Sequence, residues 1–146
     1  MKNIRSGLVV LLTLLLLGGC TMVCNIAGPT GAEQEVLNMA QEVLVLDPEG
    51  KLVRTLTTDE ELDALLDGLR LEDWTLAQLP QGAVSEGTIV FRQLETLKLG
   101  QRWEDRAMVE AARLTVYDQW AYGVLLCGGV SLCFGLPEGV YEQFWE

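Results

Sequence analysis

Apolar and polar residues alternate along much of the chain after residue 41, with the period of two that predicts β-strands. Two such stretches, 42–46 and 51–56, flank the tetrapeptide Asp47-Pro48-Glu49-Gly50. Proline at the second position and glycine at the fourth favour a type I turn. This pattern predicts a β-hairpin over residues 42–56.

One segment has the period of an α-helix, with four leucines along a single stripe: Leu62, Leu65, Leu66 and Leu69. Thr58 and Glu61 precede this stripe at the spacing of a capping box, in which the hydroxyl and the carboxylate each accept from a backbone N–H. Acids in the first turn also suit the positive end of the helix dipole. The sequence therefore predicts a helix over 59–69.

Five further stretches have strand patterns: 73–77, 87–92, 108–117, 122–127 and 130–136. Residues 94–99 also alternate and are expected to pair with 87–92. Gly128-Gly129 is a two-residue hairpin signal, because glycine tolerates positive φ. Pro137 and Glu138 can open a short C-terminal helix. The predicted fold is a single α+β domain, an antiparallel sheet with one helix packed on a face.

The first twenty residues have a different organisation. Lys2 and Arg5 precede the uncharged apolar run 8–17, which is the layout of a secretory signal. The run leads into Leu17-Gly18-Gly19-Cys20, and here the sequence resembles the lipobox of bacterial lipoproteins. The resemblance implies that Cys20 receives diacylglycerol and that the chain is cut after Gly19.

This resemblance implies three parts: a signal peptide over 1–19, a lipidated Cys20 with a tether over 20–34, and the α+β domain over 35–146. The protein would be lipid-anchored in the cell membrane or the outer membrane, with its domain outside the cytoplasm. Two acyl chains on one cysteine suffice for stable attachment. The alternatives are an uncleaved transmembrane helix within the uncharged stretch 7–27 and a cleaved, secreted form. Residues 43–69 also resemble small exported lipoproteins of unknown function, a likeness that implies no functional residue.

The amino-acid composition excludes several kinds of catalytic and metal site. The 146 residues include no histidine, which excludes Ser-His-Asp and Cys-His catalysis and histidine metal sites. A formal charge of −11 argues against nucleic acid and favours a cationic protein or peptide as partner. We expect no catalytic set, metal or cofactor, and hence a non-enzymatic binding or accessory module at the cell envelope. The alternative is a small carboxylate-based hydrolase acting on an envelope polymer.

Three cysteines remain besides Cys20. In a hairpin around Gly128-Gly129, Cys127 faces Val130 and Cys133 faces Val124, so the two thiols lie on opposite sides of the sheet. A disulfide between them would need a longer loop. Three thiols without histidine do not complete a four-coordinate zinc site, and Cys24 has no predicted role.

Acidic residues are weaker candidates for a functional site. Asp59, Glu61 and Asp63 alternate as calcium ligands do, but they interleave with the leucine stripe and predict a solvated helix face, with a weak cation site as the alternative. Asp63 and Asp67 are expected to form surface pairs with Arg70.

Six aromatic residues can serve either in the core or as a platform for a ligand: Trp74, Trp103, Tyr117, Trp120, Tyr122 and Trp145. Core packing is favoured for the set. Trp103 and Trp120 lie beside predicted turns and are the candidates for exposed contacts. Three arginines are flanked by acids and predict a mixed surface: Arg102, Arg106 and Arg113.

Overall fold

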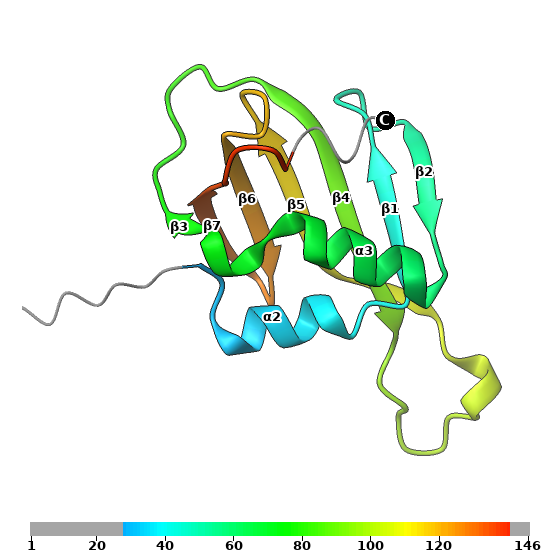
Figure 1. The fold of residues 1–146 in the computed structure, drawn as a ribbon. Coiled ribbons are helices and arrows are strands. Elements are labelled where there is room, and N and C mark those ends of the chain that lie inside the picture. Colours follow the sequence, from blue (N-terminus) through cyan, green and yellow to red (C-terminus); the bar gives the residue numbers. More distant parts are fainter. Residues whose placement is uncertain (1–27, 141–146) are drawn as a thin grey trace, which may run out of the picture.

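The computed structural model describes residues 28–140 and contains one antiparallel sheet of seven strands (Figure 1). The strands lie in the order β2-β1-β4-β5-β6-β7-β3. Their bounds are β1 Glu42–Leu46, β2 Leu52–Leu56, β3 Thr75–Leu76, β4 Ser85–Leu94, β5 Met108–Tyr117, β6 Tyr122–Cys127 and β7 Val130–Gly135. Two α-helices, α2 (Gly31–Asn38) and α3 (Asp59–Leu69), cover the same face of the sheet. The predicted α+β class with an antiparallel sheet is confirmed.

Helix α3 has the predicted bounds, and its capping box is present. The Glu61 backbone N–H donates to the Thr58 hydroxyl at 3.3 Å, and the Thr58 backbone N–H donates to the Glu61 carboxylate at 3.4 Å. The helix ends where Arg70 adopts the left-handed conformation, at φ 49°. A short 3₁₀ turn, η1 (Leu71–Asp73), follows directly.

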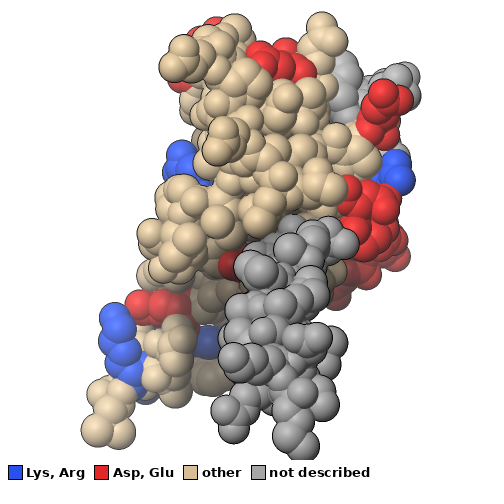
Figure 2. Space-filling view, turned by 90° about the vertical axis from the view of Figure 1, so that its left-hand side faces the viewer, with Lys and Arg blue, Asp and Glu red and all other residues tan. Residues whose placement is uncertain are grey.

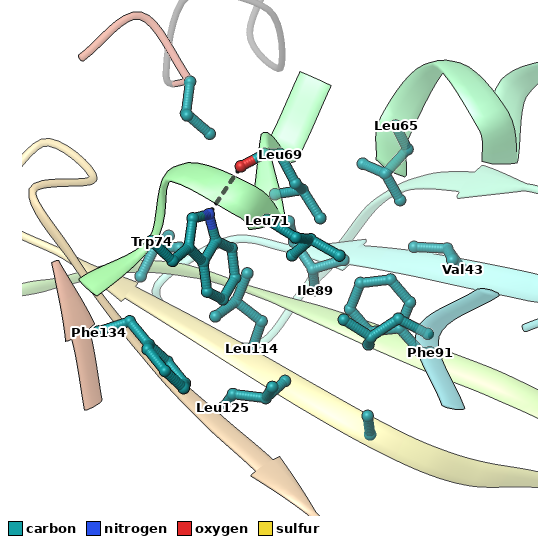
Figure 3. Close-up of a cluster of buried hydrophobic side chains, with 14 of the residues drawn as sticks. Val43, Leu65, Leu69, Leu71, Trp74, Ile89, Phe91, Leu114, Leu125 and Phe134 are labelled. Atoms are coloured by element: carbon teal, nitrogen blue, oxygen red, sulfur yellow. Dashed lines mark hydrogen bonds between the residues drawn. The ribbon is translucent and has the colours of Figure 1, made fainter. Parts of the chain in front are cut away.

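The core lies between the sheet and the helices (Figure 3). Strand side chains at alternate positions, such as Val43, Ile89 and Leu114, meet the leucines of α3. Trp74 is fully buried, and its Nε1 donates to the Leu69 carbonyl at 2.7 Å. Its ring lies 5.5 Å from that of Phe134 on β7.

The predicted tether is wrong at its C-terminal end, because α2 occupies Gly31–Asn38. Leu37 is buried in the core, and Gly28 is already packed against η1. A Cβ at Gly28 would lie 2.8 Å from the Leu71 carbonyl oxygen. The packed domain therefore begins before residue 35, since the short apolar stripe of α2 needs the sheet to become stable.

Two strand predictions also need correction. Residues 95–99 do not pair with 87–92; β4 instead runs on to Leu94, which pairs with Met108 on β5. The connecting loop, residues 95–107, contains the 3₁₀ turn η2 (Trp103–Asp105). The strand predicted over 73–77 is reduced to Thr75–Leu76, because η1 takes up its first residue. The predicted C-terminal helix lies largely outside the described residues, and 138–140 form a turn.

Replacing Trp74 with phenylalanine should destabilise the fold by about 3 kcal/mol. The change removes buried volume and leaves the Leu69 carbonyl without its indole donor. Urea unfolding followed by circular dichroism measures the loss. Trp103→Phe is the matched control, because Trp103 is 67% exposed and should change stability by less than about 0.5 kcal/mol. Equal losses in both variants would contradict the assignment.

Candidate functional site

An open groove lies between the N-terminal half of α3 and the edge hairpin β1–β2. Its volume is about 360 Å³. Seven residues line it: Val45, Arg54, Leu56, Glu60, Glu61, Ala64 and Leu65. Val45, Leu56 and Leu65 are buried and form an apolar floor, while the charged side chains come from the rim. The groove can therefore take an apolar group that carries a charge at its outer end.

Register explains why β2 contributes to this groove. Val45 pairs with Arg54, and Val43 pairs with Leu56, so Arg54 and Leu56 share the helix-covered face of the sheet. Strand β2 is an edge of the sheet, and among the described residues β1 is its only strand partner. Three of its residues besides Arg54 are exposed: Leu52, Val53 and Thr55. The groove thus opens beside an accessible strand edge.

Glu61 is held as an anion at the rim. Its carboxylate accepts from the backbone N–H groups of Thr57 and Thr58, at 3.3 and 3.4 Å, and these hydrogen bonds lower its pKa. Arg54 lies 4.0 Å away and lowers the pKa further. The carboxylate is therefore committed to the helix cap and to Arg54, and the neighbouring Glu60 is left to face incoming groups.

The other acids of α3 point into solvent, as the sequence predicts. Asp59 and Asp63 are exposed, and among residues 28–140 no three potential metal ligands come together. Arg70 pairs with Asp73 on η1, so its predicted pairing with Asp63 and Asp67 is wrong. The left-handed conformation of Arg70 turns its side chain toward η1. In Figure 2 acidic side chains gather along the side of the molecule that carries the helices.

Of the two tryptophans expected to be exposed, only Trp103 is. Its indole is 67% exposed and carries the Arg106 guanidinium at 3.7 Å from the ring centroid. Trp120 is 2% exposed, so that prediction is wrong. Asp118, Gln119 and Trp120 all have positive φ, and this left-handed turn between β5 and β6 directs the indole into the core. Trp74 is buried as expected.

The two cysteines of the last hairpin are free thiols on opposite faces of the sheet. Cys127 pairs with Val130 and Cys133 with Val124, the predicted register. Burial raises the pKa of both thiols. The disulfide alternative is therefore wrong. On β5, Arg113 forms an ion pair with Glu110, as expected of a surface of mixed charge.

The hydrolase alternative requires a carboxyl group that retains a proton near neutral pH. Among residues 28–140, three carboxyl groups have displaced pKa values, and all three are lowered: Glu61, Glu95 and Glu110. In each case hydrogen bonds to the carboxylate are the main cause. These three groups suit fixed anions rather than general acids.

Comparisons with protein-family models, with curated proteins and with solved structures find no match. Within residues 28–140, neither helix has the length and apolar character needed to cross a membrane.

Replacing Glu61 with glutamine should flatten the acid limb of the stability profile. Because the folded pKa of Glu61 lies below its ordinary value of 4.5, its contribution is present above pH 4.5 and is lost as pH falls through the folded pKa. Urea unfolding between about pH 3 and 7 should show a shallower decline for Glu61→Gln than for the natural chain. Glu60→Gln, the same change outside the capping box, is the control; if it flattens the profile equally, the cap is not the cause.

Proposed function

We propose that this protein is a lipid-anchored lipoprotein of the bacterial cell envelope whose α+β domain binds a cationic peptide or protein segment without catalysing a reaction. The anchor is carried by the sequence Leu17-Gly18-Gly19-Cys20 behind a charged and then apolar leader. The binding role is carried by one structural observation, the groove with an apolar floor under an acidic helix.

The charge around the groove supports a basic partner. Helix α3 bears three acids in its first turn and no basic residue in its last turn. Glu60 stands on the rim of the groove, and its neighbours Asp59 and Asp63 are exposed. A lysine or arginine side chain can lay its aliphatic stem on Val45 and Leu65 while its charged group meets the acids.

The edge position of β2 supports an extended partner. An extended peptide that adds to a sheet edge gains main-chain hydrogen bonds, and pockets beside the edge select alternate side chains. Strand β2 has the five residues Leu52–Leu56. The groove lies beside its C-terminal half, at Arg54 and Leu56.

Cys20→Ser should abolish incorporation of a clickable fatty acid in the bacterial host. The thiol is the acceptor for the diacylglyceryl group, and a hydroxyl at that position does not replace it. In-gel fluorescence of the labelled protein measures the incorporation. Cys24→Ser, four residues on, is the matched control and should label as the natural chain does. Unchanged labelling of the Cys20 variant would overturn the anchor.

Glu60→Lys should weaken binding of a fluorescent Leu-Lys-Leu-Lys-Leu-Lys peptide about fivefold, equivalent to about 1 kcal/mol, because it reverses one charge on the groove rim. Fluorescence anisotropy measures the affinity, which should also fall as salt rises to about 0.5 M.

The control for this change is Glu49→Lys. Glu49 is an exposed acid in the β1–β2 turn, at the opposite end of that hairpin from the start of α3. The Glu49→Lys variant makes the same change in net charge as Glu60→Lys, but at a site away from the groove. Equal weakening by both variants would mean that the peptide senses overall charge, and the groove would then have no specific role.

A further inference from the structure

The loop between β4 and β5, residues 95–107, projects beyond the end of the sheet (Figure 1). Its tip holds three large apolar side chains in solvent. Leu97 is 43% exposed, Trp103 is 67% exposed and Leu99 is fully exposed. A leucine side chain that stays exposed in the folded protein gains none of the free energy that burial of its apolar surface would release. Their placement points to a surface that they contact.

The tip is also basic, in contrast to the acidic chain. Residues 97–103 contain Lys98 and Arg102 and no acid, with Glu104 and Asp105 following directly in η2, whereas the whole chain has a formal charge of −11. Arg106 stacks on Trp103 just behind the tip. In Figure 2 basic side chains, with acidic ones beside them, lie at the lower end of the molecule, the end at which this loop projects in Figure 1.

Internal hydrogen bonds hold the loop in this shape. The Gln101 side chain donates to Glu95 at 2.7 Å and to the Asp105 carbonyl at 3.2 Å, and it accepts from the Lys98 backbone N–H at 3.1 Å. Glu95 also accepts from the Ala107 backbone N–H. These bonds satisfy the polar groups at the base of the loop. The loop is therefore already ordered, and contacts made by Leu99 and Trp103 do not incur the conformational entropy cost of ordering it.

We propose that this tip inserts into the headgroup region of an anionic lipid bilayer, with Leu97, Leu99 and Trp103 among the upper acyl chains and Lys98 and Arg102 at the phosphates. Tryptophan is favoured at this interface because its ring is apolar and its N–H remains hydrated. Basic residues near the surface add attraction to anionic lipids.

A bilayer suits the shape of the tip better than a protein partner does. A projecting tip meets a soft lipid surface without a complementary pocket, whereas a protein partner would have to supply one. The inference rests on the proposed function only for the tether that keeps the tip near a bilayer. From Cys20 to Gly28 the chain spans at most about 28 Å, which keeps the domain beside the membrane and raises the effective concentration of the tip.

The test uses the full precursor carrying Cys20→Ser, reconstituted into vesicles of phosphatidylcholine with or without phosphatidylglycerol. The apolar leader tethers this chain without any acylation, so a failure of the proposed lipid anchor does not affect the result. Tryptophan fluorescence is measured with and without doxyl-labelled lipid. Trp74 and Trp120 are buried in the protein, and Trp145 lies outside the described residues; subtraction of the Trp103→Phe variant removes the signal of all three and isolates Trp103.

The proposal predicts that Trp103 is quenched by doxyl lipid and emits at shorter wavelength in the anionic vesicles. Both effects should diminish in neutral vesicles and with Leu99→Ser. Val84→Ser is the matched control, since Val84 is 65% exposed and lies just before β4, at the opposite end of the strand from the loop. It should leave both signals unchanged. If Trp103 is not quenched in anionic vesicles, or is quenched equally with neutral lipid, the proposal is wrong.

Discussion

The connection from β2 to β3 has to cross the whole sheet, and the helical layer depends on how the two ends of this connection are held. Strands β2 and β3 are consecutive in the chain but lie at opposite edges. Six strand spacings separate them, about 29 Å. Helix α3 and η1 supply about 22 Å of that length. The connection between Leu56 and Thr75, here called the strap, therefore has little length to spare as it crosses the core.

Interactions between residues close in sequence fix the position of each end of the strap. The capping box of Thr58 and Glu61 starts α3 directly after β2. At the other end, the left-handed Arg70 turns the chain into η1, and Trp74 hydrogen-bonds back to the carbonyl of Leu69 while it packs on Phe134. Because the strap begins over the edge hairpin, small Ala64 and the rim acids stand above Val45 and Leu56. The groove is thus a consequence of where the strap begins.

Local signals in the sequence account for most of the elements. The hairpin of β1 and β2, helix α3 and the opposed thiols of Cys127 and Cys133 follow from turn residues, a capping box and strand alternation. Three features depend on long-range packing and could not be predicted in this way. Helix α2 has only a weak apolar stripe, the turn at Asp118–Trp120 is left-handed without glycine, and the groove forms only when α3 lies on β1–β2. The exposure of Trp103 is as predicted, because this residue lies among charged residues in a connection between two strands.

The face of the sheet opposite the helices carries an apolar residue, Val90, that is shielded from solvent in a way that Leu99 on the projecting loop is not. No α-helix among the described residues covers this face (Figure 1), yet one of its apolar side chains is buried. Val90, which alternates with the core residues Ile89 and Phe91, is only 4% exposed. Arg113 lies opposite it in register, and ion pairs of Arg113 with Glu110 and of Arg92 with Glu42 place long aliphatic stems along the face.

Charged side chains therefore screen Val90 on this open side of the sheet, whereas Leu126, which pairs with Arg113, is 39% exposed. Exposure is greater at the loop tip, where Trp103 is 67% exposed and Leu99 is fully exposed. The same chain that shields Val90 with an arginine leaves Leu99 uncovered, on a loop that Gln101 and Glu95 hold in a defined shape. Exposed apolar side chains also occur elsewhere, Val84 among them, but this loop gathers Leu97, Leu99 and Trp103 within seven residues. An apolar medium in contact with the tip would recover the hydration free energy that the folded chain alone leaves unused.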